Sequence, residues 1–315
     1  MSPSKKSTAA KSFGITLPAT SANLGPAFDA AALAFALYLK IEARIADGYT
    51  IKASGRDADI CGRLENHLIL TTYQEVLQSA GRAPVPLALK VSNNIPIGKG
   101  CGSSAAARLA GIALANHYGN LRWTDVQIVG EASRREHHPD NASACWMGGL
   151  TVARMSGEAE AQVARIRPKG EWPLLLAVSP QSLSTEKARG VLPAQYSRSD
   201  AVTNIQNSML LLSAFIQGNP EFLRAALQDR IHQPYRAALC PLLPAMQAFD
   251  RDDAILGTAL SGAGPSVLIF LEPRGEASRK KVAAKVAAYL KEKRLTAELF
   301  LTGIADEGAA ASRRK

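Results

Sequence analysis

Hydrophobic and polar residues alternate along two stretches in the first third of the chain. In "LYLKIEARI" (37–45), Leu, Leu, Ile, Ala and Ile occupy every second position, with Tyr, Lys, Glu and Arg between them, and "VPLALKV" (85–91) alternates similarly. A repeat of two residues is typical of strands with one buried face. We therefore expect a strand at each of these segments.

Between and after these strands the pattern changes to one that favours helices. Residues 65–81 predict a helix closed by a glycine. The small residues at 103–118 predict a helix that approaches its neighbours closely. Thr124 and Gln127 have the spacing of a capping box, which predicts a further helix over 124–136.

The second half of the chain restarts the alternation of strands and helices. It predicts a strand at 173–179 and helices at about 200–217 and 220–231. After the segment "AILGTALSGAGPSVLIFLEP" (254–273), it predicts a helix and a final strand at 297–304. No internal repeat is evident in either half. The fold class predicted is therefore α+β, with two subdomains that divide somewhere in the middle of the chain.

Composition restricts the class of protein. The 315 residues are 47% hydrophobic and 20% charged, as in ordinary globular proteins, and no apolar run approaches the roughly 20 residues that cross a bilayer. The polar N-terminus lacks the apolar core of a secretory signal. Four cysteines lie far apart without a CxxC pair, so we expect a reduced, cytoplasmic protein with no zinc site and no membrane partner.

The net charge of +10 raises the question of a nucleic-acid partner, so its location matters. Residues 12–273 hold 23 basic and 22 acidic residues, whereas residues 274–294 hold eight basic and two acidic residues and residues 1–11 hold three lysines. A solvated, lysine-rich helix face explains the excess, and a weak anion-attracting or nucleic-acid surface is the alternative. We expect no nucleic-acid partner.

The most unusual stretch is "PIGKGCGSSAA" (96–106), in which Gly98, Gly100 and Gly102 occupy every second position before two serines. Neither a strand nor a helix favours such glycines. The Walker pattern fails because a glycine follows Lys99, and the third glycine comes one residue too early for the Rossmann pattern. Inward-turned amides, a helix N-terminus and a cation indicate a phosphate site. A loop that simply needs positive φ angles is the alternative.

This stretch resembles the ATP-binding loop of the GHMP kinase superfamily, with Cys101 in place of the usual leucine. Residues 17–43 and 260–270 resemble the first and third motifs of that superfamily, in the right order. Within it, "SANLGPAFD", "HPDN", "STEKARGVLP" and "DRIHQPYRAALCP" resemble the sequence blocks of homoserine kinases. The fold implied is the two-subdomain α+β GHMP kinase fold, with a ribosomal protein S5-like N-terminal part and a ferredoxin-like C-terminal part.

The resemblance also implies an organisation and an activity. The organisation is a flexible arm at 1–11, an ATP-binding N-terminal domain at 12–165, a C-terminal domain at 166–305 dividing from it near 155–170, and a tail at 306–315. The activity is the ATP-dependent phosphorylation of L-homoserine to O-phospho-L-homoserine in threonine biosynthesis, with ATP as co-substrate and Mg²⁺ as cofactor. The resemblance allows a homodimer.

Homoserine presents an ammonium, a carboxylate and a hydroxyl, and the resemblance supplies residues for each. It places Asp29 at the ammonium and places Arg189 and Arg236 at the carboxylate, where a guanidinium pairs in a bidentate way. Taken singly, Asp29 would serve as a cap and the arginines as surface residues. The resemblance places three polar side chains around the hydroxyl of homoserine: Asn23, His138 and Asn141.

For the metal, the resemblance gives Ser104 a role as a Mg²⁺ ligand, together with a glutamate. We choose Glu131, with Glu136 as competitor and a plain surface carboxylate as the alternative. The candidates for catalysis are Asn23, Asp140 and Asn141. Because Asn141 cannot take a proton, we hypothesise that no strong base acts and that the proton leaves late, in a loose transition state.

The remaining residues are assigned to binding of the nucleotide. "ENHLI" (65–69) resembles a nucleotide-facing block, and Asn66 either bonds the adenine or caps the helix that begins there. The turn "SGAGPS" (261–266) is expected to close over the site. The other residues assigned to ATP are Pro96, Ile97, Gly98, Lys99, Gly100, Cys101, Gly102, Ser103, Ser104, Ala105 and Ala106.

Two rival functions remain open on the sequence. The first is a kinase of the same superfamily for another small alcohol, against which the two arginines argue because they suit an amino-acid carboxylate. The second is a nucleotide-binding regulator or nucleic-acid-binding protein without kinase chemistry, against which the intact glycine loop and the nearly neutral body argue.

Overall fold

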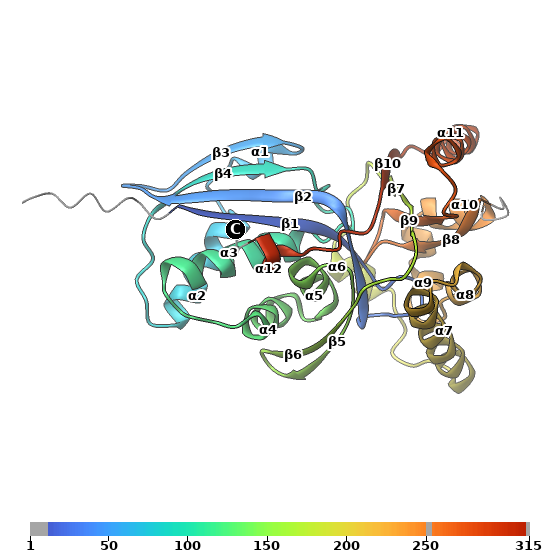
Figure 1. Cartoon of the computed structure of the whole chain (residues 1–315), viewed down its shortest axis with the longest axis horizontal. Coiled ribbons are helices and arrows are strands. Elements are labelled where there is room, and N and C mark those ends of the chain that lie inside the picture. The colour runs from blue at the N-terminus through green and yellow to red at the C-terminus, as the bar shows by residue number, and fades with distance from the viewer. Residues whose placement is uncertain (1–11, 250–253, 313–315) are drawn as a thin grey trace, which may run out of the picture.

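Two sheets, one in each half of the chain, organise the structure, a computed structural model that describes residues 12–249 and 254–312 (Figure 1). The strands of the first sheet are β1 (Phe13–Ala22), β2 (Ala31–Ile45), β3 (Thr50–Gly55), β4 (Leu87–Asn93), β5 (Leu150–Gly157) and β6 (Glu160–Ile166). The order is β3-β4-β2-β5-β6, and β1 pairs with β2. Because β2 is 15 residues long, its residues 39–45 pair with β4 and its residues 31–33 pair with β5.

Helices from the same half of the chain pack against this sheet. They are α1 (Ala58–Cys61), α2 (Leu68–Ser79), α3 (Ser103–Tyr118), α4 (Asp125–Glu136) and α5 (Asp140–Met147). Helices α2 to α5 lie beneath β1 and β2 in Figure 1. As its small residues predicted, α3 approaches α2 closely, since a Cβ at Gly111 would meet the carbonyl oxygen of Ile69.

The second sheet is fully antiparallel, in the order β10-β7-β9-β8. Its strands are β7 (Leu174–Val178), β8 (Ile255–Leu260), β9 (Val267–Leu271) and β10 (Glu298–Thr302). The helices between β7 and β8 are α6 (Thr185–Gly190), α7 (Arg198–Gln217), α8 (Pro220–Ala226), α9 (Gln233–Arg236), the 3₁₀ turn η1 (Ala237–Leu239) and α10 (Leu242–Phe249), and α11 (Glu276–Glu292) precedes β10. This strand–helix–strand–strand–helix–strand succession is ferredoxin-like, as expected.

The two halves share one hydrophobic core. Its largest cluster joins Leu17 and Leu33 of the first sheet with Leu176 and Phe270 of the second, together with Phe215 of α7. After β10 the chain returns to the first sheet through α12 (Ala309–Ser312), where the Ser312 hydroxyl accepts a hydrogen bond from the backbone N–H of Thr16. A cavity lined by residues of both halves lies where they meet.

For most helices, the bounds predicted from local sequence signals agree closely with the bounds in the structure. The helix expected at 103–118 has these bounds, and α4 begins one residue later than expected, with Thr124 and Gln127 forming both bonds of the capping box. The helix expected over 220–231 ends at Ala226. None of the helices in the described ranges 12–249 and 254–312 has the length and hydropathy that a membrane crossing needs.

Candidate active site

The glycine loop forms a bend that requires its glycines. Gly98, Gly100 and Gly102 have φ angles of 68°, 77° and 72°, in the left-handed region that favours glycine. Gly102 is the N-cap of α3 and no side chain caps this 16-residue helix, so its first N–H groups and the positive end of its dipole lie at the loop.

Two neighbouring segments hold this loop in place. A Cβ at Gly100 would overlap the carbonyl oxygen of Ser261, and a Cβ at Gly102 would overlap the hydroxyl of Thr20 in β1. The Ser261 hydroxyl also donates to the carbonyl of Gly100 over 2.8 Å. The turn expected to close over the site therefore contacts the glycine loop directly.

A cavity of about 110 Å³ lies between the loop and this turn. Its wall brings together residues from both halves of the chain: Ala22, Asn23, Asp29, Gly98, Gly100, Cys101, Gly102, Ser103, Ser104, Glu136, His138, Asp140, Asn141, Leu183, Thr185, Arg189, Arg236, Gly262, Ala263 and Gly264. The residues that we expect to bind the ammonium, the carboxylate and the hydroxyl of homoserine therefore line one cavity.

A second, mostly apolar pocket of about 490 Å³ adjoins the first and shares Gly98, Ser103 and Ser104 with it. Its wall includes the apolar side chains of Leu39, Ile60, Ile69, Val91, Ile95 and Ile97. Asn66, which is exposed, also lines this pocket. The N-cap of α2 is His67, so the alternative of a helix cap at Asn66 is not what the structure shows.

Not every residue assigned to ATP faces these pockets. Pro96, Lys99, Ala105 and Ala106 line neither of them, and the two alanines are buried in α3. The ammonium of Lys99 donates to the carbonyl of Pro180, and burial lowers the pKa of Lys99.

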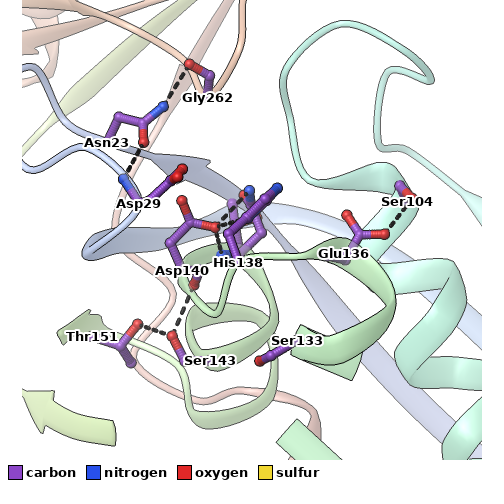
Figure 2. A network of polar contacts seen from close by, with 12 residues as sticks. Asn23, Asp29, Ser104, Ser133, Glu136, His138, Asp140, Ser143, Thr151 and Gly262 are labelled. Carbon is purple, nitrogen blue, oxygen red and sulfur yellow. Dashed lines mark hydrogen bonds and ion pairs between the residues drawn. The ribbon is translucent and has the colours of Figure 1, made fainter. Parts of the chain in front are cut away.

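Asp29 and Arg189 form an ion pair in the cavity. Nη2 of Arg189 donates to both carboxylate oxygens of Asp29, at 2.7 and 2.9 Å, across 160 residues of sequence. Asn23 fixes Asp29 by accepting its backbone N–H over 2.9 Å, while the Asn23 amide donates to the carbonyl of Gly262 over 2.8 Å (Figure 2). The two groups expected to hold opposite ends of homoserine therefore neutralise each other here.

Arg236 lies deeper and has a different environment. It is 1% exposed, donates to the carbonyl of Ala188 over 3.0 Å, and lies 5.2 Å above the ring of Phe28. Nη1 donates to Nδ1 of His232 over 3.2 Å, and Nε2 of His232 in turn donates to a backbone carbonyl. Burial, together with the charge of Arg189, lowers the pKa of Arg236. In the part of the chain that the structure describes, no carboxylate forms an ion pair with this guanidinium.

The "HPDN" block begins α5 and forms a small polar network (Figure 2). Oδ1 of Asp140 accepts from Nδ1 of His138 at 2.6 Å and from the backbone N–H of Asn141 at 2.5 Å. Burial alone would lower the pKa of His138, but the hydrogen bond and charge of Asp140 outweigh it and raise that pKa. Oδ1 of Asn141 accepts from the hydroxyl of Thr20 over 2.6 Å, which orients the Asn141 amide.

The carboxylate beside Ser104 belongs to Glu136. The Ser104 hydroxyl donates to Oε1 of Glu136 over 2.7 Å (Figure 2). Glu131, the residue we chose from the sequence, bonds to Arg134 and Arg135 instead and does not line the cavity. The structure therefore favours Glu136 as the glutamate beside Ser104. Glu136 is in the last turn of α4, which faces α3, whereas Glu131 lies more than one turn earlier.

Sequence reasoning missed several residues of the site. Phe28 lies beneath both arginines, at 5.4 Å from Arg189, and Thr20 orients Asn141. Leu183, just before "STEKARG" (184–190), and Thr185, within it, also line the cavity. Thr185 directly follows the N-cap Ser184, a local signal that could have identified it, whereas the contact of Thr20 depends on the tertiary fold.

Comparison with known proteins identifies close relatives. Residues 67–149 match the family model of the GHMP kinases N terminal domain, and residues 211–292 match that of the GHMP kinases C terminal domain. The homoserine kinase of Solibacter usitatus is 41% identical over 82% of this chain and 85% of the relative. The homoserine kinase of Desulfitobacterium hafniense is 37% identical over 94% of this chain and 98% of the relative.

Solved structures confirm the fold. The homoserine kinase from Cytophaga hutchinsonii superposes with a TM-score of 0.80 and 21% identity, covering 98% of both chains. The phosphomevalonate kinase of Streptococcus pneumoniae superposes with a TM-score of 0.67 and 14% identity, covering 94% of this chain and 99% of that one. The two-domain α+β fold expected from the sequence is therefore confirmed.

Proposed function

The chain belongs to the homoserine kinase family of the GHMP kinases, and from that premise we propose that it transfers the γ-phosphoryl group of ATP to the hydroxyl of L-homoserine. The product is O-phospho-L-homoserine, and the reaction is the step towards threonine that its relatives' name implies. Catalysis of this kind depends mainly on positioning the reactants and on stabilising charge.

The buried cation of Arg236 is the observation that carries the proposal. A charge removed from water is costly unless it is paired, and this one faces a cavity with no carboxylate partner in the described residues. A substrate carboxylate satisfies it. The substrate ammonium then takes the place of the Arg189 guanidinium at Asp29, which frees Arg189 for the same carboxylate.

ATP occupies the neighbouring surface in this proposal. The apolar pocket takes the adenine, with Asn66 at its wall, and the amides of the glycine loop and of the first turn of α3 take the phosphates. Gly98, Ser103 and Ser104 line both pockets, so a nucleotide that spans them brings its terminal phosphate towards the homoserine cavity.

Ser104 and Glu136 fit a magnesium ion. Both present oxygen atoms, the ligands that Mg²⁺ prefers, and these atoms lie 2.7 Å apart. Oε1 of Glu136 also accepts from Nε of Arg108 at 2.6 Å, so a bound ion would share this carboxylate with Arg108. When bound, the ion neutralises charge on the nucleotide phosphates. Asp29, His138 and Asp140 form another cluster of potential ligands, but one member is a nitrogen donor, which Mg²⁺ does not prefer.

Asp140 acts in this proposal as a positioning residue. Its Oδ1 already accepts bonds from His138 and Asn141, and these bonds orient the polar groups around the substrate hydroxyl. The proton of that hydroxyl leaves late, to phosphate or water, in keeping with a loose transition state. Asp140→Asn, which keeps an acceptor oxygen, should therefore retain measurable turnover. Loss of nearly all turnover with unchanged affinity for ATP and homoserine would identify Asp140 as an essential base.

The location that we propose is the cytoplasm. All four cysteines are free and three of them are buried, as a reducing compartment allows.

Release of ADP from ATP and magnesium tests the function directly. We expect rapid release with L-homoserine and little with L-serine, mevalonate or galactose. The ³¹P NMR spectrum should show a phosphomonoester in step with the ADP formed. Equal release with all four alcohols, or release that L-homoserine does not stimulate, would overturn the proposal.

A further inference from the structure

His232 is a buried titratable residue that lies next to the cavity without lining it. Its side chain is 0% exposed, and it directly precedes α9, the short helix that carries Arg236. The imidazole stacks on the ring of Phe28, with 5.2 Å between the ring centroids. Because His232 is not among the residues that line the cavity, any part that it plays in the reaction acts through a neighbour.

The hydrogen bonds of His232 determine which ring nitrogen carries the hydrogen. Nε2 lies 2.8 Å from the carbonyl oxygen of Gly25, which can only accept, and Nδ1 lies 3.2 Å from Nη1 of Arg236, which can only donate. Oδ2 of Asp229, 3.6 Å from Nε2, favours the hydrogen on that same nitrogen. Burial lowers the pKa of His232 to about 4, so at neutral pH the ring is uncharged and Nδ1 presents a lone pair.

This lone pair fixes the orientation of the Arg236 guanidinium. Nε of Arg236 donates to the carbonyl of Ala188 over 3.0 Å, while Nη1 donates to His232 and, at the longer distance of 3.4 Å, to the carbonyl of Gly262. Within residues 12–249 and 254–312, Nη2 has no hydrogen-bond partner. Since a guanidinium is planar, fixing Nε and Nη1 also fixes the direction of Nη2.

The fold holds the imidazole in place from both ends of α9. The Asp229 carboxylate accepts from the backbone N–H groups of Ile231 and His232, at 2.9 and 2.8 Å, and so fixes the chain before the helix. Oε1 of Gln233 accepts from the backbone N–H of Leu260 over 2.6 Å, which ties the helix to β8. The position of Nδ1 is therefore set before any ligand binds.

Packing alone does not explain a histidine at this position. An apolar ring would stack on Phe28 equally well, but it would leave the carbonyl of Gly25 without its donor. It would also leave Nη1 of Arg236 with only the 3.4 Å contact to Gly262. A buried cation that loses a well-oriented acceptor is costly, so the ring nitrogens and not the ring shape account for the residue.

We infer that His232 is a positioning residue for homoserine binding: the lone pair of its Nδ1 holds Nη1 of Arg236, so that Nη2 is directed at the substrate carboxylate. This role rests on the proposed function, because it needs the carboxylate to bind at Arg236. The bond from Nε2 to Gly25 selects the tautomer that makes Nδ1 an acceptor.

Asparagine and glutamine each reproduce one ring nitrogen of histidine, and together they test this role. The side-chain oxygen of asparagine takes the position of Nδ1 and keeps an acceptor for Arg236, whereas the amide nitrogen of glutamine takes the position of Nε2 and keeps only the donor to Gly25. His232→Gln should raise the KM for L-homoserine roughly 10-fold, because Arg236 loses a charged hydrogen bond. His232→Asn should raise that KM less than about threefold.

An alcohol without a carboxylate distinguishes positioning from general damage to the fold. With 3-amino-1-propanol, which is homoserine without its carboxylate, both variants should match wild type, and the KM for ATP should be unchanged in both. An equal rise in the KM for L-homoserine in the two variants, or a loss of activity that is the same with both alcohols, would overturn the role of His232 and leave the proposed function intact. A wild type that does not phosphorylate L-homoserine would overturn both.

Nitrogen-15 NMR of the full-length wild-type protein, labelled at its histidines, tests the tautomer without substrate. At pH 7 the His232 ring should show a protonated Nε2 and an unprotonated Nδ1, and the signals missing from His232→Asn identify this ring. A hydrogen on Nδ1 would contradict the inferred role, because that nitrogen would then have no lone pair for Arg236.

Discussion

At the scale of single residues, we propose that Arg236 determines which substrate the site accepts. Its guanidinium is fixed by Ala188, by His232 and by the ring of Phe28, so it has little freedom to follow a ligand that lacks a carboxylate. Preorganisation of this kind stabilises the complex because no ordering of the side chain remains to be done on binding.

Arg236→Met should raise the KM for L-homoserine roughly 100-fold and leave the KM for ATP unchanged, since removing one partner of a buried charge pair costs about 3 kcal/mol. Steady-state kinetics with 3-amino-1-propanol, which is homoserine without its carboxylate, provides the comparison. Wild type and variant should use that alcohol equally poorly. The exposed Arg224→Met serves as a control. If wild type used both alcohols equally well, Arg236 would have no role in carboxylate recognition.

Substitutions of Glu136 and Glu131 form a matched pair that tests which carboxylate binds the magnesium ion. Glu136→Gln should lower activity roughly 100-fold and increase the magnesium concentration needed for half-maximal rate, because it removes the carboxylate beside Ser104. Glu131→Gln should change little, because that carboxylate bonds only to arginines of its own helix and to no group in the cavity. A magnesium titration of both variants distinguishes the two carboxylates. A larger loss of activity and a larger magnesium requirement in Glu131→Gln than in Glu136→Gln would contradict the assignment.

At the scale of elements, the glycine loop works as a fixed part of the fold, clamped between β1 and the "SGAGPS" turn. Gly100→Ala should lower the free energy of unfolding by about 3 kcal/mol, through left-handed strain and overlap with the backbone of Ser261. Gly98→Ala meets nothing closer than 3.6 Å and should cost about 1 kcal/mol. Gly14→Ala in β1, with open space around it, should cost nothing. Urea denaturation measures all three, and equal losses at Gly14 and Gly100 would contradict this account.

Sequence signals predicted the elements whose boundaries depend on local chemistry. The glycine before α3 and the capping box before α4 marked both helices to within a residue. β1 carried no clear signal because all of its residues from Leu17 onward are buried, which removes the alternation of a one-sided strand. The four-residue α9 is too short for any periodicity, although it carries Arg236.

The sequence predicted which residues lie near one another better than it predicted their pairings. The charged residues that the resemblance assigns to homoserine line one cavity, whereas spacing alone does not decide which turn of α4 faces α3, and therefore does not distinguish Glu136 from Glu131. The ion pair of Asp29 with Arg189 joins residues 160 positions apart, and only the packing of the two halves brings them together.

At the scale of the whole molecule, His232 links stability to pH. Burial lowers the pKa of His232 to about 4, whereas the unfolded chain should show about 6.5. As the pH falls from 6.5 towards 4, the unfolded chain binds a proton that the folded protein rejects, so stability decreases across this window and is unaffected above it. His138 acts in the opposite direction: its raised pKa adds stability below pH 6.5 that is lost as the pH rises through its folded value.

His232→Gln should therefore lose less stability than wild type between pH 7 and pH 5, although it starts from a lower value because the bond to Arg236 is disturbed. Urea denaturation at the two pH values gives the difference. His137→Gln, at an exposed position, is the control and should follow wild type. An identical loss in wild type and His232→Gln would show that His232 is not the group responsible.

A crystal structure with a non-hydrolysable ATP analogue, magnesium and L-homoserine tests the central claim most directly. We predict phosphates against the amides of residues 98–104, the homoserine carboxylate on Arg236, its ammonium on Asp29 and its hydroxyl directed at the terminal phosphate. Homoserine bound away from Arg236, or a nucleotide that leaves the glycine loop untouched, would contradict the account.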